Sequence, residues 1–284
     1  IATTTLNNPV SGVSETLTGL TAGTPYNIRV TTTFGGASTV CPTYAFITSS
    51  GAAPCTNGMD VAFIIDYTSS MSGEIEAIKT GVASIIQTID TASGSNNYRL
   101  SLVTADEGGG TSSVPSYNTS TDYLALPSAQ RIINTGIGNR QFITAWEMFQ
   151  DNNNTTFTTQ LNLLNSGAPT AGVPMALGQV IEASFTNAFR SNVAKYCIII
   201  TDAAAGGNDD VFNATDYARL GSLTTTALNE GVKVFVLGSG TSQTYVNAGV
   251  TVYPWREISI NTGGNWNVSE TPTVIQNEII AGCS

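Results

Sequence analysis

Short runs of consecutive apolar residues alternate with stretches of helical periodicity from residue 59 to the end of the chain. The clearest runs are 61–65, 98–105 and 195–201, and runs of this kind are typical of strands buried on both faces of a parallel sheet. After the first run, apolar residues recur on one helical stripe: Ile75, Ile78, Val82, Ile85, Ile86 and Ile89. The alternation predicts an α/β fold, a doubly wound and mostly parallel sheet flanked by helices.

Residues that are typical of helix ends mark the bounds of several later elements. Pro174 lies near the first turn of one predicted helix, and Gly231 lies just past the end of another. Helices are predicted at 173–185, 214–230 and 273–281. Strands are predicted at 232–240 and 256–260, with a short helix near 241–248 between them. For residues 106–165 the pattern predicts an edge hairpin and a short helix at 155–165, without a firm topology.

The amino-terminal region has a different pattern, in which residues 11–48 alternate in strand fashion. The spacing of Leu17, Leu20, Gly23, Thr24, Tyr26, Ile28 and Val30 resembles the second half of a fibronectin type III domain. We expect 1–48 to form a partial fibronectin-like β sandwich whose open edge needs a partner. An unrelated β-hairpin is the alternative. Residues 49–58 have the composition of a linker, so the α/β domain is predicted to span 59–284.

Polar side chains follow two of the buried strands. Asp66, Thr68 and Ser70 come at every second position after the first strand, and Asp202 follows the strand at 195–201. Ligands of doubly wound sheets bind beyond the carboxyl ends of the strands. A carboxylate and two hydroxyls at such an end are half of a cage for a hard cation.

Together with Thr170 in the sequence GAPTAG, these residues resemble the metal-ion-dependent adhesion site of von Willebrand factor A domains. The resemblance covers about 55–283 and includes the Thr-Gly-Gly at 262–264. It implies that one divalent cation, Mg²⁺ or alternatively Ca²⁺ or Mn²⁺, is held by these five side chains: Asp66, Thr68, Ser70, Thr170 and Asp202. All-oxygen ligands suit these ions and not zinc. Two carboxylates and three hydroxyls leave a coordination position for a carboxylate from a partner.

Two features depart from the family pattern. Tyr67 stands where the family often has glycine, so its ring is expected to rim or partly cover the ion. Asp202 is followed by three alanines rather than by a glycine. The competing interpretation is that Asp66 and Asp202 only cap helices and hold no ion.

The amino-acid composition excludes several classes of function. Only 11% of the 284 residues are charged, the formal net charge is -10, and there is no histidine. The negative charge argues against nucleic acid and anionic membranes as partners. The absence of histidine excludes Ser-His-Asp catalysis and His-ligated zinc. Scarce charge and many uncharged polar residues favour an extracellular or cell-surface location.

Four cysteines are present, at positions 41, 55, 197 and 283. The resemblance implies that the two ends of the A domain lie together, and some family members bridge them, so a Cys55–Cys283 disulfide is expected. Cys197 begins a buried strand and is expected to be a core thiol. Pairing of Cys41 with Cys55 stays open as an alternative.

These observations predict an extracellular adhesion or recognition module that is not an enzyme. Its partner would be a protein or glycan that offers a carboxylate, and neighbouring copies could join through the open β edge. A structural subunit of a surface filament or layer is the alternative. A metal-assisted hydrolase is less favoured, because no histidine or second metal cluster supplies a base.

Overall fold

The computed structural model describes residues 25–28, 31–34, 37–40, 44–47, 55–107, 121–131, 133–134, 141–164, 177–178, 180–181, 189–206 and 212–283. It divides the chain into two compact units, Ile1–Ser50 and Gly51–Ser284. Each unit is described by itself.

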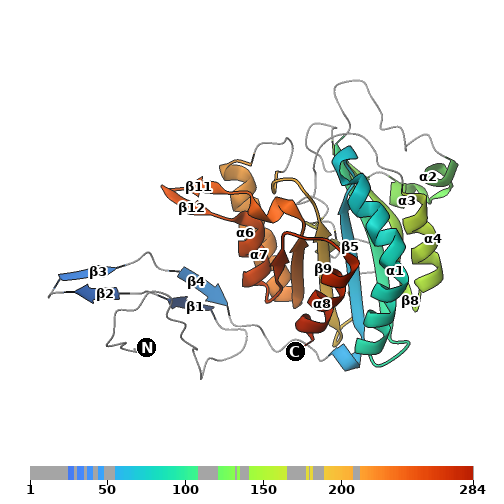
Figure 1. Cartoon of the computed structure of the whole chain (residues 1–284), viewed down its shortest axis with the longest axis horizontal. Helices are drawn as coiled ribbons and strands as arrows, with labels where there is room; N and C mark the ends of the chain where they lie inside the picture. Colours follow the sequence, from blue (N-terminus) through green and yellow to red (C-terminus); the bar gives the residue numbers. More distant parts are fainter. Residues whose placement is uncertain are drawn as a thin grey trace. The chain divides into compact units, whose positions relative to one another are not determined.

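The first unit contains two antiparallel strand pairs (Figure 1). Strand β1 (Pro25–Ile28) pairs with β4 (Tyr44–Ile47), and β2 (Thr31–Phe34) pairs with β3 (Ala37–Val40). The strand character expected for this region is therefore present, whereas its fibronectin-like identity stays a prediction. Cys41 lies outside the described residues.

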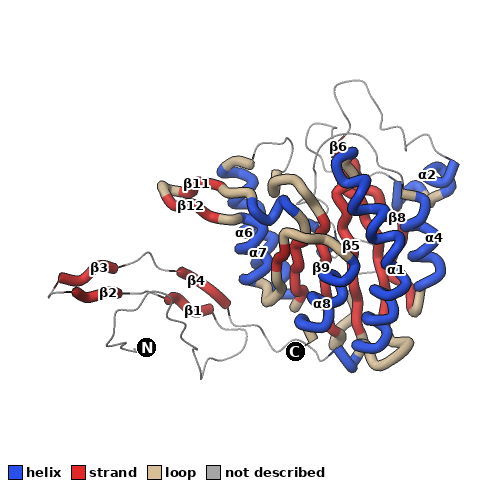
Figure 2. Tube along the Cα trace, in the orientation of Figure 1, coloured by secondary structure: helices blue, strands red, loops and turns tan. Residues whose placement is uncertain are grey.

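The second unit is built on a seven-stranded sheet in the order β13-β10-β9-β5-β6-β8-β7 (Figure 2). The central strands are β5 (Met59–Asp66), β6 (Tyr98–Glu107), β9 (Ala194–Ile200) and β10 (Val232–Leu237). These four are mutually parallel, as is the short β13 (Trp266–Asn267) beside β10. β8 (Gln141–Asp151) runs antiparallel to β6 and pairs with β7 (Ile133–Asn134) at the edge. The predicted α/β fold with a mostly parallel sheet is confirmed.

Helices cover both faces of this sheet. On one face lie α1 (Ser72–Ala92), α4 (Asn154–Leu163) and α8 (Pro272–Gly282), whose buried side chains join those of Val61, Phe63 and Ile65 in one cluster. On the other face lie α6 (Ala214–Glu230) and α7 (Pro254–Asn261), which pack with Ala62 and Ile64. Two short helices, α2 (Thr121–Ala125) and α3 (Ser128–Arg131), precede β7. Residues 177–178 and 180–181 of the helix predicted at 173–185 are helical.

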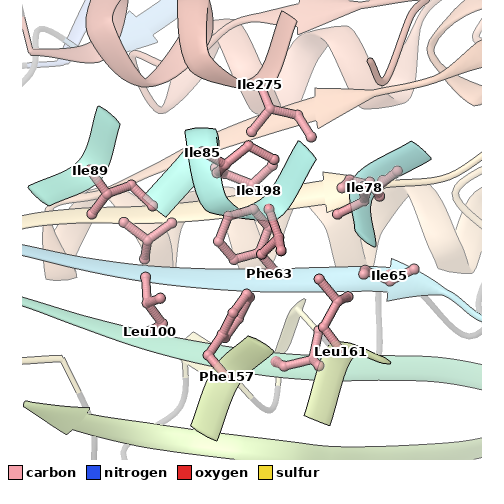
Figure 3. Packing of buried hydrophobic residues seen from close by; sticks show 14 of the residues in the cluster. Phe63, Ile65, Ile78, Ile85, Ile89, Leu100, Phe157, Leu161, Ile198 and Ile275 are labelled. Atoms are coloured by element: carbon pink, nitrogen blue, oxygen red, sulfur yellow. The ribbon is translucent and has the colours of Figure 1, made fainter. Parts of the chain in front are cut away.

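Strand β5 is buried over its whole length because both of its faces are covered. Figure 3 shows Phe63 and Ile65 of β5 among Ile78, Ile85 and Ile89 of α1, with Phe157 and Leu161 of α4 on the same side. All six residues of the predicted α1 stripe are buried. The packing of α1 on β5 therefore follows from two sequence patterns: the helical spacing of the apolar residues in α1, and the continuous apolar run of a strand that is covered on both faces.

Two local predictions were wrong. Residues 256–260 form part of helix α7 and not a strand; Pro254 opens the helix, and Trp255, Ile258 and Ser259 are its buried positions at helical spacing. The helix expected near 241–248 is only a 3₁₀ turn, Ser239–Ser242. An antiparallel hairpin, β11 (Tyr245–Asn247) with β12 (Val250–Val252), follows it. At the hairpin's turn, Ala248 and Gly249 have positive φ, the conformation that such turns require.

The chain ends of the second unit are joined covalently. Cys55 and Cys283 form a disulfide with a sequence separation of 228 residues. The hydroxyl of Tyr196 lies 3.2 Å from the sulfur of Cys55 and 3.5 Å from that of Cys283. Cys197 is a buried free thiol, as expected for a core position. None of the described helices is both long and apolar enough to cross a bilayer.

Candidate metal centre

The carboxyl ends of β5 and β9 lie side by side. The two strands pair in parallel with Ile65 opposite Ile200, so Asp66 and Thr201 follow at neighbouring positions. The chain passes from β5 to β6 on one side and returns through β9 on the other, which makes this the point where the strand order reverses. Sheets of this type bind ligands at such a point.

Asp66 is held by two hydrogen bonds, one to each carboxylate oxygen. Its Oδ1 accepts from the backbone N–H of Thr68 at 3.2 Å, and its Oδ2 accepts from the hydroxyl of Thr201 at 2.7 Å. The Thr201 oxygen in turn accepts from the backbone N–H of Ala203 at 3.0 Å. The side chain of Asp66 is therefore fixed in orientation, and each oxygen keeps a lone pair for a further partner.

The two predicted hydroxyl ligands lie beside each other on the loop between β5 and α1. Thr68 Oγ1 and Ser70 Oγ are 2.9 Å apart. Thr68 is buried and Ser70 is exposed, while Asp202 is half-buried. The donors thus range from a buried carboxylate to an exposed hydroxyl, a gradient that suits an ion reached from solvent. Thr170 lies outside the described residues.

The carboxylate of Asp66 is in an unfavourable environment for a charge. Burial is the main cause that raises the pKa of Asp66 to about 6, with repulsion from Asp202 acting in the same direction. Hydrogen bonds from Thr201 and Thr68 only partly offset this effect. Among the described residues no lysine or arginine forms an ion pair with Asp66. A buried charge ordinarily requires such a partner.

The loop after β9 is held from both sides. The indole N–H of Trp255 in α7 donates to the carbonyl of Ala203 at 3.0 Å. Two glycines that follow β10 pass close to the backbone of this loop. A Cβ on Gly238 would lie 2.3 Å from the carbonyl oxygen of Thr201, and a Cβ on Gly240 would lie 2.3 Å from the carbonyl oxygen of Ala203. Only glycine fits at these two positions. The element predicted wrongly as a strand, α7, thus helps to position the loop that carries Asp202.

Tyr67 does not rim the site. Its side chain is 1% exposed and packs in the cluster beneath α1 and α8. Tyr67 follows Asp66, and alternation along the extended chain turns its ring to the face opposite the carboxylate. The expectation that its ring covers the ion is therefore wrong.

Sequence reasoning missed Thr201 and the two glycines at 238 and 240. Thr201 immediately precedes Asp202, and a hydroxyl at the end of the strand beside β5 could have been considered as a partner of Asp66. The glycines stand in the sequence LGSG directly after a buried strand, a signal for close backbone approach.

The donor set fits a hard divalent cation. Among the described residues no group of three or more His, Cys, Asp or Glu side chains is placed to hold a metal ion. A site here therefore depends on two carboxylates supplemented by the hydroxyls of Thr68 and Ser70. Oxygen donors of this kind suit Mg²⁺, Mn²⁺ or Ca²⁺.

No family model matches the chain, and no curated protein matches it. Solved structures that are similar to this chain include proximal thread matrix protein 1 from the mussel byssus, with 13% identity and a TM-score of 0.47 over 81% of this chain and 47% of that one. The pilus adhesin SpaC from Lactobacillus rhamnosus GG, in its open conformation, has 13% identity and a TM-score of 0.48 over 93% of this chain and 32% of that one. The chain spans less than half the length of either.

Proposed function

We propose that the chain is an extracellular adhesion or recognition module that binds a partner's carboxylate through one divalent cation. Asp66, Thr68, Ser70 and Asp202 would hold the ion, with Thr170 as a fifth ligand. The observation that carries the proposal is the environment of Asp66, a fully buried carboxylate whose hydrogen bonds within the described part of the chain come from neutral groups. A bound cation would supply the missing counter-charge.

The exposed side of the site suits recognition. Ser70 is exposed and Asp202 is half-buried, so an ion held beside them would remain within reach of another molecule. With only two carboxylates in the set, a divalent ion keeps attraction for an incoming anion. Exposed Asp or Glu side chains of a protein, or acidic sugars of a glycan, carry the matching group.

We also propose that this site binds and does not catalyse. The chain has no histidine, and the proposed ligands use both carboxylates to hold the ion. No separate group is then left among them to act as a general base on a bound water.

Calorimetric titration of the full chain with MgCl₂, and separately with MnCl₂ and CaCl₂, tests the metal site. We expect one ion per chain in the wild type and loss of binding in Asp66→Asn and Asp202→Asn. Asp122→Asn removes an exposed carboxylate on α2 and is the matched control. Absence of binding for all three ions, or equal binding by the Asp66 variant, would refute the site.

A second measurement tests the open coordination position. Water-proton relaxation of the Mn²⁺-loaded chain should show an exchangeable inner-sphere water, and sodium acetate should displace it. Metal binding without any exchangeable water would mean that the ion is enclosed by the protein. In that case the ion would be structural and the adhesion proposal would be wrong.

A further inference from the structure

One arginine at the carboxyl end of the sheet has no acidic partner among the described residues. Arg256 lies in the first turn of α7 and is half-buried. Within the described part of the chain its guanidinium makes one hydrogen bond, from Nε to the carbonyl of Thr241 at 3.0 Å, and no ion pair. By contrast, Arg99 and Arg190 both pair with the carboxylate of Asp60. A half-buried cation without a counter-charge requires an explanation.

Two aromatic rings hold the guanidinium of Arg256 in place. Its Cζ atom lies over both rings, 4.4 Å from the centre of the Tyr253 ring and 5.5 Å from that of the Trp266 ring. A guanidinium stacks on a ring through its own flat face, so the N–H groups at its edge stay available. The bond from Nε to Thr241 restricts the group further. The Nη atoms are therefore oriented donors that have no acceptor among the described residues.

The contacts of Arg256 come from segments beyond the end of β10. Thr241 lies in the 3₁₀ turn after that strand, Tyr253 is the N-cap of α7, and Trp266 belongs to β13, which pairs with the last residues of β10. Strands β5, β9 and β10 are parallel, so their carboxyl ends lie at one edge of the sheet. The guanidinium is thus placed at the same end of the sheet as Asp66.

The surroundings of Arg256 are partly exposed and apolar. Tyr253 is 39% exposed, Trp266 is half-buried, and Val268, two positions after Trp266, is 59% exposed. Tyrosine, tryptophan and arginine are the residue types that contribute most to binding in protein interfaces. The guanidinium covers one face of each ring, which leaves less ring surface for a sugar, and valine gives sugar hydroxyls no hydrogen-bond partner. The chemistry therefore favours a protein segment as the occupant.

We propose that this part of the molecule binds an Asp or Glu side chain of a partner protein, flanked in the partner by apolar residues. The Arg256 surface, as we call it, consists of Arg256, Tyr253, Trp266 and Val268. The Nη groups donate to the two oxygens of the partner carboxylate, a pairing for which guanidinium geometry is suited. The stacked rings already restrict the arginine, so little side-chain entropy is lost on binding. The proposal does not depend on a metal at Asp66.

Selection from a phage-displayed library of random peptides tests the Arg256 surface. The bait is the full chain carrying Asp66→Asn, in EDTA, so that the proposed metal centre cannot contribute. Peptides are selected on this chain and counter-selected on the same chain with Arg256→Gln added. We expect the retained peptides to carry Asp or Glu beside apolar residues. In a synthetic copy, replacing that acid by its amide should weaken binding about tenfold, because a charge-assisted pair is lost.

Tryptophan fluorescence measures the affinity of the synthetic peptides. The chain has three tryptophans, of which Trp146 and Trp255 are buried, so a peptide bound at the Arg256 surface should change the emission of Trp266. Arg256→Gln should weaken peptide binding about tenfold. Arg256→Lys should weaken it severalfold although the charge is kept, since lysine lacks the planar fork.

Arg131→Gln is the matched control. It removes a positive charge from α3, next to β8 and at the other edge of the sheet from β13, and should bind the peptides as the parent does. Urea unfolding of each variant checks that the fold persists. Tyr253→Leu leaves the guanidinium in place without its stacking partner and should weaken binding severalfold, which gives a second test if Arg256→Gln is unstable.

Four results would overturn the proposal. In the first, no peptide distinguishes the parent from Arg256→Gln; in the second, the distinguishing peptides lack an acidic residue. In the third, Arg131→Gln weakens binding as much as Arg256→Gln does. In the fourth, an oligosaccharide of glucuronic acid displaces the peptides at equal or lower concentration, and the occupant would then be a glycan. Because every arm lacks Asp66 and contains EDTA, none of these results bears on the proposed metal centre.

Discussion

Asp60 and Asp66 lie at opposite ends of β5, and neither side chain is exposed to solvent. Asp60 accepts hydrogen bonds from the guanidinium groups of Arg99 and Arg190. Asp66 accepts hydrogen bonds from the hydroxyl of Thr201 and the backbone N–H of Thr68, which are neutral groups. Among the described residues, the same residue type, equally buried on one strand, thus has two cationic partners at the amino end and none at the carboxyl end.

If the proposed metal site is present, the difference separates a structural end of the sheet from a binding end. At the amino end the buried charge is compensated within the chain, and the Cys55–Cys283 disulfide lies beside the same strand ends. In the proposal made above, a bound cation supplies the compensation at the carboxyl end. A buried carboxylate without a counter-charge destabilises the fold, and this cost is the reason why we propose a binding role for this end.

Removal of the disulfide should give the largest effect on stability at the amino end. Cys55 and Cys283 close a loop of over two hundred residues, and chain entropy predicts a contribution of about 5 kcal/mol. We expect the Cys55→Ser/Cys283→Ser variant to unfold at a clearly lower urea concentration than the wild type. Cys197→Ser, in a buried thiol that forms no bridge, controls for loss of a sulfur atom. Equal midpoints for the double variant and the wild type would contradict the assignment of this end as structural.

The paired aspartates can be compared directly. Asp60→Asn leaves two arginines without their carboxylate, which costs about 3–5 kcal/mol when a partner is removed from a buried pair. Asp66→Asn removes an uncompensated charge, so in chelator at pH 7 we expect no loss of stability, or a gain of about 1–2 kcal/mol. Urea unfolding of both variants in EDTA measures the contrast. Similar destabilisation by the two substitutions would show that the two ends of β5 do not differ.

Much of this contrast could be predicted from sequence, but not all of it. The spacing of Asp66, Thr68 and Ser70 after a buried strand predicted the metal site that we propose, because strand ends and turn spacing are local features. The Asp60 cluster depends on Arg99 and Arg190, which are distant in sequence and meet only through the pairing of β5 with β6 and the chain before β9. Apolar periodicity carries no signal for such a contact.

The errors have a similar origin. Residues 256–260 alternate in a way that suggests a strand, and only the burial of Trp255 and Ile258 against the sheet selects the helix. Tyr67 was placed at the rim by its position next to Asp66, whereas the extended backbone directs its ring into the core. In both cases tertiary packing decides between local alternatives that sequence leaves close in free energy.

Titration of Asp66, at the carboxyl end of β5, should change the stability of the fold by a smaller amount, and the direction of this change with pH can be predicted. Because the pKa of Asp66 is raised to about 6, the folded state binds a proton more tightly than the unfolded chain does. In chelator, the stability contributed by this proton is complete below about pH 4 and is lost as pH rises through about 6. A cation competes with the proton, so stabilisation by Mg²⁺ should grow over the same range, towards about 2.7 kcal/mol at one hundred times the dissociation constant.

Thermal unfolding from pH 4 to 8, with EDTA or with Mg²⁺, measures how stability in chelator and stabilisation by Mg²⁺ each change with pH. Asp66→Asn should lose the component that belongs to Asp66 and respond little to Mg²⁺ at any pH. A Mg²⁺-dependent shift that is as large at pH 4.5 as at pH 7.5 would contradict competition at Asp66.

Thr201 should give the smallest and most specific change. Its hydroxyl holds Asp66 Oδ2 and accepts from the N–H of Ala203, so it joins the two strand ends that carry the carboxylates. Thr201→Val removes one such hydrogen bond to Asp66, worth about 1 kcal/mol, and we expect Mg²⁺ affinity to fall about fivefold while the fold persists. Thr201→Ser keeps the hydroxyl and should restore affinity, whereas a general packing defect would not be corrected by the smaller side chain. If calorimetry shows that serine weakens Mg²⁺ binding as much as valine does, the hydroxyl does not position Asp66, and the order at the carboxyl end has another source.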